Sequence, residues 1–269
     1  MKILITGATG FLGKELIKRL YGTGDIRVVS RNEGKLIELK HQYPEIEIIT
    51  GDIADSFIAE IAVKDIDTIY HLAAFKHVGL AETQPYECVM SNVVGTINLL
   101  KVFKGKLFLA ISTDKAAQVT GVYGATKYLM EELIKEFQGI RDTKYRIVRY
   151  GNVLYSTGSV LCKWKDLMQQ GKEVIITDPK ATRFFWTVEQ AVDHIFAGIA
   201  NATDCTPYVP EMKGMSIGDL LEAMMQKYGR VEVKEIGLQA GENLHETIDG
   251  KIFSNNVPQY SVDEIKELI

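Results

Sequence analysis

Over the first 150 residues, short apolar runs alternate with longer segments in which apolar positions recur with a helical period. The apolar runs predict strands at Lys2–Thr6, Ile26–Ser30, Glu45–Ile49, Thr68–His71, Leu107–Ile111 and Arg146–Arg149. The intervening segments predict helices near residues 11–22, 32–42, 55–63, 84–104 and 121–138. Parallel sheets with crossover helices require this alternation. We therefore predict an α/β fold with a doubly wound parallel sheet of the Rossmann type, whose ligand crevice lies beyond the carboxyl ends of the strands.

The alternation loosens after the sixth predicted strand. There the pattern predicts a helix over 158–170, a strand over 173–177 and a helix over 187–200. We expect residues 1–150 to form the sheet domain and residues 151–269 to form mainly a smaller C-terminal lobe. Its second helix is expected to pack back on the sheet domain. No repeat or long linker separates the two parts, so we expect them to be packed together.

The composition is that of an ordinary globular protein, with 269 residues of which 46% are hydrophobic and 25% charged. A net charge of −4 gives no overall basic field, so we expect no nucleic-acid partner. Cys88, Cys162 and Cys205 lack metal-ligand spacing, so no metal site is predicted, and they are typical of reduced thiols. The chain shows neither an apolar run near the ~20 residues of a membrane span nor a signal-peptide pattern. We expect a cytoplasmic protein without a membrane partner.

Three glycines follow the first predicted strand at the spacing GxxGxxG, where a helix begins. Glycine lets a turn approach a pyrophosphate closely, and a helix N-terminus offers free N–H groups and a positive dipole to it. Such a trio in isolation also fits a simple tight turn. Its place after the first strand favours a dinucleotide site made by Gly7, Thr9, Gly10, Phe11, Leu12 and Gly13.

The second predicted strand ends in Ser30 and Arg31, where an acidic residue usually binds a free ribose 2′-hydroxyl. A hydroxyl and a guanidinium suit a 2′-phosphate instead, and Asn32 and Lys35 follow closely. We therefore predict NADP as the cofactor in preference to NAD. The alternative is that Arg31 is a solvated surface charge.

Two further turns after strands are candidate cofactor contacts. Asp52 and Ile53 follow the third strand, where the carboxylate could accept from the adenine amino group, although Asp52 also fits a simple turn. His71 ends the fourth strand and is expected to be a hydrogen-bonded core side chain. The residues after it, which would let the backbone lie close to the cofactor, are Leu72, Ala73 and Ala74.

The fifth strand leads into Ser112-Thr113-Asp114-Lys115, and a YxxxK sequence runs from Tyr123 to Lys127. Four-residue spacing places Tyr123 and Lys127 on one helix face. We expect the ammonium to lower the phenol pKa toward neutrality, so that Tyr123 can act as a base. A YxxxK sequence by itself is common, but together with Thr113 behind a strand and the glycine turn it favours catalysis.

These features together resemble the extended short-chain dehydrogenases. The residues that match their pattern are Gly7–Gly13, Asp52, His71–Ala74, Thr113, Tyr123 and Lys127. More narrowly, the sequence resembles the UDP-N-acetylglucosamine 4,6-dehydratases that invert carbon 5. The stretches that carry this resemblance are Ala73–Val78, Ser112–Ala117, Tyr123–Lys127, Arg149–Val153, Ile176–Asp178, Thr182–Phe184 and Gly241–Glu246. The resemblance implies an NADP-dependent lyase that acts on a UDP-sugar in polysaccharide biosynthesis.

The resemblance also implies a redox-neutral cycle. Tyr123 takes the proton of the carbon-4 hydroxyl, which Thr113 holds, while hydride passes to the nicotinamide. Lys115 removes the carbon-5 proton and Asp114 protonates the leaving carbon-6 hydroxyl, after which hydride returns to carbon 6. This requires a neutral Lys115 and a protonated Asp114. We therefore expect these two side chains to point to different parts of the sugar and not to form an ion pair.

Substrate contacts are implied by the same resemblance at Lys76, Asn152, Arg183 and Glu242. Asn152 and Arg183 match positions that contact the diphosphate in relatives, and a guanidinium can bind phosphate oxygens bidentately. Either could instead be structural, as a turn asparagine or a surface ion pair. His245 and Glu246 are further candidates, and His77 has no assigned role. The C-terminal lobe is thus expected to bind substrate and the sheet domain the dinucleotide.

In the predicted helix over 84–104, apolar residues cover more of the helix surface than the one side that would pack against a sheet. We expect its second face to meet another subunit in a homo-oligomer. Alternatively, the C-terminal lobe of the same chain covers this second face of the helix.

Two other classes of function stay open from the sequence. A nucleotide-sugar 4-epimerase or a ketone reductase of the same fold would use Tyr123 and Lys127 but leave Asp114 and Lys115 idle. A non-catalytic NADP-sensing protein would need neither Thr113 nor the YxxxK pair.

Overall fold

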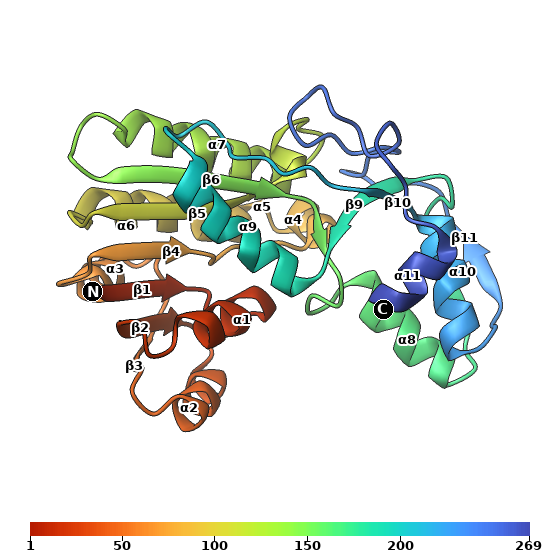
Figure 1. Cartoon of the computed structure of the whole chain (residues 1–269), viewed down its shortest axis with the longest axis horizontal. Helices are drawn as coiled ribbons and strands as arrows, with labels where there is room; N and C mark the ends of the chain where they lie inside the picture. The colour runs from red at the N-terminus through yellow and green to blue at the C-terminus, as the bar shows by residue number, and fades with distance from the viewer.

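The computed structural model describes residues 1–269. Its main sheet has six strands in the order β3-β2-β1-β4-β5-β6, and every neighbouring pair is parallel (Figure 1). The strands are β1 (Lys2–Thr6), β2 (Asp25–Ser30), β3 (Glu47–Thr50), β4 (Thr68–His71), β5 (Leu107–Thr113) and β6 (Lys144–Tyr150). The strand order reverses between β1 and β4, as in other doubly wound sheets. The predicted fold class is confirmed.

Helices cover both faces of this sheet because its strands present apolar side chains to both sides. In β1, Ile3 and Ile5 pack into one buried hydrophobic cluster and Leu4 packs into another. The first cluster is closed by α1 (Phe11–Leu20), α2 (Glu33–Gln42) and α9 (Val188–Asn201). The second is closed by α3 (Ser56–Val63), α6 (Gly95–Val102) and α7 (Val122–Phe137). In Figure 1, α1 and α9 lie in front of the sheet.

The helix predicted over 84–104 is continuous in the structure from Pro85 to Val102, with a π-helical turn in its middle. After α4 (Val78–Thr83), α5 (Pro85–Val89) begins at a proline, which needs no N–H donor there, and a π-helical turn (Met90–Val94) leads into α6. Helices α3 and α7 contact α6 and cover much of the apolar surface on which the oligomer prediction rested. Tyr86 and Val89 stay exposed, at 70% and 39%. The homo-oligomer stays a prediction.

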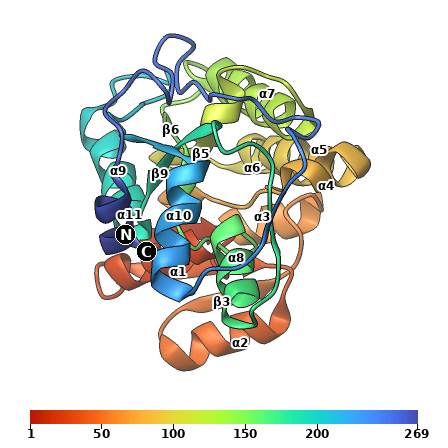
Figure 2. The same cartoon turned by 90° about the vertical axis from the view of Figure 1, so that its right-hand side faces the viewer.

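The C-terminal part of the chain surrounds a third hydrophobic cluster. Its elements are β7 (Asn152–Val153), α8 (Val160–Gln169), β8 (Val174–Ile176), β9 (Thr182–Trp186), β10 (Gly214–Ser216), α10 (Ile217–Tyr228), β11 (Val233–Glu235) and α11 (Val262–Leu268). Figure 2 shows α8 beside α10, and the two helices are in contact. Helix α9 contacts α1 and β6. None of the helices combines the length and the apolar character needed to cross a lipid bilayer.

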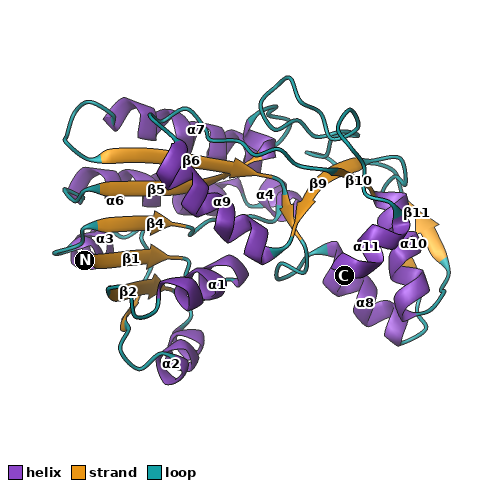
Figure 3. Cartoon of the chain, viewed as in Figure 1, coloured by secondary structure: helices purple, strands orange, loops and turns teal.

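Sequence patterns located α8, β8 and α9 to within two residues but missed the remaining elements of this part. Strands β7, β9, β10 and β11 have two to five residues each, and Figure 3 shows long loops in this part of the chain. Helix α10 did carry a signal, because Ser216 caps its N-terminus and a helical apolar period follows.

His71 is a fully buried, hydrogen-bonded core side chain at the end of β4, as the sequence predicted. Its Nδ1 lies 2.8 Å from the Thr6 hydroxyl and its Nε2 lies 2.9 Å from the Thr96 hydroxyl. Burial, with a smaller effect of the Lys127 charge, lowers the pKa of His71 from 6.5 to about 3. The imidazole is therefore neutral in the folded protein at every pH above that value.

This depressed pKa makes stability depend on pH in a defined direction. Unfolded chains bind a proton at His71 below about pH 6.5. The free energy of unfolding should therefore fall as the pH falls from 6.5 toward 3, and this residue should contribute a loss of about 2 kcal/mol between pH 7 and 5. We expect His71→Asn to remove that share of the pH dependence, measured by urea unfolding at both pH values. Exposed His41→Asn is the matched control, and equal pH dependence of the wild type and His71→Asn would contradict the assignment.

Candidate active site

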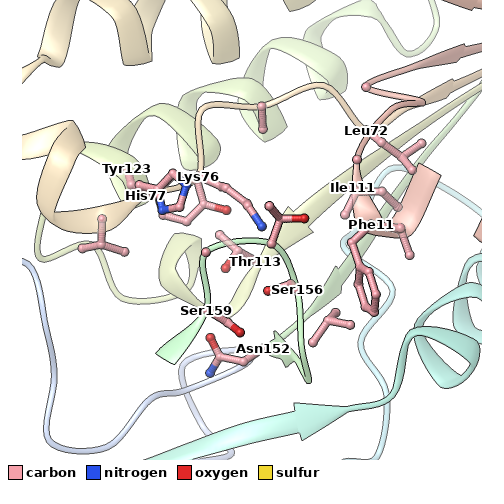
Figure 4. A pocket seen from close by; sticks show the side chains of 18 of the residues that line it. Phe11, Leu72, Lys76, His77, Ile111, Thr113, Tyr123, Asn152, Ser156 and Ser159 are labelled. Carbon is pink, nitrogen blue, oxygen red and sulfur yellow. The ribbon is translucent and has the colours of Figure 1, made fainter. Parts of the chain in front are cut away.

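A cavity of about 730 Å³ lies beyond the carboxyl ends of the parallel strands, bounded by the main sheet and the C-terminal part. In Figure 4, Phe11 and Leu72 lie at one end of it, and Lys76 and His77 lie at the other. Most residues predicted to form the site line this cavity. They are Gly7, Thr9, Gly10, Phe11, Leu12, Gly13, Ser30, Arg31, Asp52, Ile53, Leu72, Ala73, Ala74, Lys76, Thr113, Lys115, Tyr123, Lys127, Asn152, Arg183 and Glu242.

The glycine turn between β1 and α1 allows other backbone segments and a ligand to lie very close to its own backbone. Gly7 has a φ of +69°, and a Cβ there would lie 2.7 Å from the backbone nitrogen of Ala73. A Cβ on Gly13 would lie 2.6 Å from the backbone of Ala8. Gly10 begins α1 without a side-chain cap, so the N–H groups of the first turn are open to an anion. These features fit a dinucleotide pyrophosphate.

Of the four residues predicted to bind the cofactor at the end of β2, two line the cavity and two do not. Ser30 hydrogen-bonds the Thr9 hydroxyl at 2.8 Å, and the largely exposed Arg31 lies 3.4 Å from Asp52 at the rim of the cavity. Asn32 lies outside the cavity because its side-chain oxygen caps α2, accepting from the Lys35 N–H at 2.9 Å. Lys35 also lies outside it, on the first turn of that helix. Only Ser30 and Arg31 of the four predicted residues line the cavity.

Tyr123 and Lys127 lie on one face of α7 and both line the cavity. The ammonium of Lys127 donates to the carbonyl oxygen of Ile111 at 2.5 Å, and burial lowers its pKa to about 8. Burial raises the pKa of Tyr123 to about 12, against an opposing effect of the nearby Lys115 charge. The expectation that Lys127 lowers this pKa toward neutrality is wrong for the protein alone, because Lys127 is bound to a carbonyl and burial dominates at the phenol.

Asp114 and Lys115 form an ion pair, which also corrects the sequence prediction. Both lie in a 3₁₀ turn (Asp114–Ala116) after β5, and the Lys115 ammonium lies 3.1 Å from Asp114 Oδ1. That oxygen also accepts from the Thr113 hydroxyl at 2.8 Å. Asp114 is fully buried and does not line the cavity, whereas Thr113 and Lys115 do. The carboxylate therefore lies one hydrogen bond behind the cavity wall.

A buried ion pair that the sequence analysis missed fixes this wall. Glu131 follows Lys127 by one turn of α7 and is fully buried. Its carboxylate accepts from Arg149 Nε at 3.1 Å and Nη2 at 2.5 Å, and also from the Ser112 hydroxyl. Arg149 Nη1 donates to the carbonyl of Ile248 at 2.9 Å. The continued four-residue spacing of the YxxxK pair was the available signal for Glu131.

The four predicted substrate contacts all face the cavity but differ in their surroundings. Arg183 is buried and donates to the carbonyls of Thr182 and Leu244 at 2.8 and 3.2 Å. Asn152 contacts the Phe184 carbonyl at 3.4 Å, and Glu242 accepts from the Gln239 N–H. Lys76 has no carboxylate partner, and burial lowers its pKa. No group of His, Cys, Asp or Glu side chains is arranged to hold a metal ion.

One wall of the cavity comes from residues for which the sequence offered no signal. They are the loop residues Ser156, Thr157, Gly158 and Ser159 and the α8 residues Lys163 and Trp164. Gly158 has a φ of +77°, and a Cβ there would lie 2.7 Å from the His77 ring. Only the packing of the C-terminal part against the segment after β4 creates this contact.

Several known proteins are similar to this chain in sequence. The family model described as "Polysaccharide biosynthesis protein" matches residues 3–264. An inverting UDP-N-acetylglucosamine 4,6-dehydratase of Campylobacter jejuni is 36% identical over 91% of this chain and 76% of its own. An uncharacterized membrane protein of Methanocaldococcus jannaschii is 36% identical over 99% of this chain and 84% of its own.

Solved structures resemble the whole chain. The X-ray structure of Pen from Bacillus thuringiensis has a TM-score of 0.94 and 28% identity, covering 100% of this chain and 96% of the other. A UDP-glucuronic acid 4-epimerase from Bacillus cereus, solved with UDP-glucuronic acid and NAD, has a TM-score of 0.83 and 22% identity over all of both chains. At 22% identity, the likeness to the UDP-glucuronic acid 4-epimerase shows a shared fold alone.

The Glu131–Arg149 pair yields a stability prediction. Removing the negative charge by Glu131→Gln leaves the Arg149 guanidinium buried without its counter-charge, which costs about 3–5 kcal/mol. We expect that loss in the free energy of unfolding measured with urea. The matched control is Glu132→Gln, because Glu132 pairs with Lys135 at the surface, where the loss should be below about 1 kcal/mol. Equal losses for the two variants would contradict the structural role of Glu131.

Proposed function

Because the chain belongs to the polysaccharide biosynthesis protein family, as an extended short-chain dehydrogenase/reductase resembling the inverting UDP-N-acetylglucosamine 4,6-dehydratases, we propose that it is a nucleotide-sugar dehydratase. It converts UDP-N-acetylglucosamine to a UDP-4-keto-6-deoxy sugar with inversion at carbon 5. One observation carries this proposal: a single cavity brings Thr113, Tyr123 and Lys115 together beside the glycine turn. A 4-epimerase or a ketone reductase has no use for Lys115 in that wall.

The charges of the cavity suit a nucleotide diphosphate. Lys76, Lys163 and Arg183 reach it from three different segments of the chain. Lys76 is exposed and has no carboxylate partner, so its ammonium is available to pair with an anionic ligand in the cavity. We assign the diphosphate to these cations together with Asn152. In this proposal residues 151–269 mainly bind the substrate.

The glycine turn would hold a nicotinamide dinucleotide, which would supply the hydride acceptor for carbon 4. Tyr123 takes the proton of the carbon-4 hydroxyl, which the Thr113 hydroxyl positions. The high pKa of Tyr123 in the protein alone means that a positive charge in the cavity is needed to favour the phenolate. Lys127 lies on the same helix face, lines the cavity and is assigned to the cofactor together with Tyr123.

The elimination needs Lys115 as a neutral amine and Asp114 as a carboxylic acid. One proton moving from Lys115 Nζ to Asp114 Oδ1 across 3.1 Å converts the ion pair into that form without changing the total charge. Lys115 then takes the carbon-5 proton. Asp114 provides the proton for the departing carbon-6 hydroxyl by way of Thr113 or Lys115, which separate it from the cavity. After water has left, the pair is again the ion pair from which it began. Carbon 5 then regains a proton from water on its opposite face, which gives the inversion, and the Tyr123 phenol returns its proton to solvent.

The function is tested with UDP-N-acetylglucosamine in deuterated water, without added cofactor, and with the product followed by NMR. We expect a 4-keto-6-deoxy sugar that carries deuterium at carbon 5. Lys115→Met should abolish that deuterium uptake, whereas exposed Lys101→Met should retain it. A carbon-4 epimer with its carbon-6 hydroxyl intact would identify an epimerase, and dependence on added NADPH would identify a reductase.

The preference for NADP is tested at the end of β2. We expect Arg31→Ala to weaken NADP binding about tenfold and to leave NAD binding unchanged, because only NADP carries the 2′-phosphate. Calorimetric titration with both nucleotides measures the two affinities. The control is Arg230→Ala, another exposed arginine paired with a carboxylate but remote from the cavity. Equal NAD and NADP binding that Arg31→Ala leaves unaltered would remove Arg31 from this role.

A further inference from the structure

One buried carboxylate in the cavity wall has no part in the mechanism above. Glu246 belongs to the loop that follows β11, lines the cavity and is only 1% exposed. Its Oε1 lies 3.7 Å from Lys115 Nζ and 3.8 Å from Arg183 Nε. Its Oε2 accepts from the Asn243 side chain at 3.2 Å. Glu246 therefore lies between a proposed catalytic base and a proposed substrate contact.

The backbone around Glu246 is held from both sides. Its N–H donates to the Ser254 hydroxyl at 3.0 Å, and its carbonyl accepts from the Ser254 N–H at 2.8 Å. The Ser254 hydroxyl also lies 2.7 Å from that of Thr182, the first residue of β9. The carboxylate is thus fixed relative to the strand that carries Arg183.

The four side chains Asp114, Lys115, Arg183 and Glu246 form a balanced group of two negative and two positive charges. Asp114 attracts the Lys115 ammonium from behind the cavity wall, and Glu246 attracts it from the cavity side. Without the Glu246 charge, Lys115 would have one ionic partner, and that partner lies away from the substrate. Arg183 would lose its carboxylate neighbour as well.

We propose that Glu246 is a positioning residue that holds the Lys115 amine at the cavity wall and sets how readily Lys115 gives up its proton. This inference rests on the proposed dehydratase function. Glu246 acts through Lys115, and the step that it controls is removal of the carbon-5 proton.

The groups that face Lys115 give the direction of the expected pH effect. They are Asp114 on its own turn, Tyr123 on α7, Arg183 on β9 and Glu246 on the C-terminal loop. Burial lowers the pKa of Lys115, but the two carboxylates outweigh it and the pKa is raised above 10.5. Removing the Glu246 charge should therefore lower the pKa of Lys115, by about one unit or more for a carboxylate at this range.

The test uses Glu246→Gln, which removes the charge with little change of shape, and Glu246→Asp, which keeps the charge. Exposed Glu235→Gln on β11 is the matched control. The first measurement is the rate of reductive methylation of Lys115 as a function of pH, read by mass spectrometry of its peptide. The second is the pH profile of deuterium uptake at carbon 5 of UDP-N-acetylglucosamine.

For Glu246→Gln we expect the methylation midpoint to move down by about one pH unit. The maximal rate of deuterium uptake should still fall at least about tenfold, because the amine is no longer held at the cavity wall. Glu246→Asp should keep its midpoint close to that of the wild type, and Glu235→Gln should match the wild type in both measurements. An unchanged midpoint in Glu246→Gln would overturn the proposal, even if activity fell, because a merely structural role predicts that result.

Two further outcomes are decided by the same variants. If Glu246→Gln does not fold, Glu246→Asp decides, and a midpoint shifted down by a full unit despite the retained charge would overturn the proposal. If the wild type does not turn over the sugar nucleotide, the dehydratase proposal fails, while methylation still shows whether Glu246 controls the proton on Lys115.

Discussion

The buried ion pair between Glu131 and Arg149 sets the geometry on which the site depends. Removing two charges from water costs several kcal/mol for each ion, and only complete hydrogen bonding offsets that cost. Here Glu131 accepts two Arg149 donors and the Ser112 hydroxyl, and Arg149 reaches the carbonyl of Ile248. Helix α7, strands β5 and β6 and the C-terminal segment therefore have one satisfactory arrangement. Thr113 and Lys127, next to these residues, are positioned by it.

Charge balance is the second constraint on the site. Asp114 and Lys115 are neighbours in a short 3₁₀ turn and form an ion pair. While both side chains are ionised, they are therefore too close together to act on separate parts of a sugar. Their contact does not exclude acid–base catalysis, because a single proton shift between them yields the neutral amine and the acid. The buried Glu246 and Arg183 add one charge of each sign. The wall can therefore stay electrically neutral while protons move within it.

Much of the main sheet could be predicted from sequence because its strands are buried on both faces. A run such as Ile3-Leu4-Ile5 is apolar at every position, and the turn that follows carries the glycines that close approach demands. Turn residues directly after strands, such as Ser30 and Thr113, line the cavity as expected. Asn32 and Lys35 lie outside the cavity, where the asparagine oxygen caps a helix, and their cofactor contacts stay predictions. Proximity in sequence to a strand end did not specify the direction of these side chains.

Local sequence is enough to predict the order of strands and helices along the chain, the crevice edge at which chemistry could occur, and the residue types available there. These follow from hydrophobic period, glycine geometry and helix spacing, which act over a few residues. Three features instead depend on the folded chain: Asp114 turns away from the cavity, Glu131 binds Arg149, and Glu246 meets Lys115. Those contacts join segments far apart in the chain or depend on side-chain burial. Their energies are set by the packing of the whole core, which no local pattern contains.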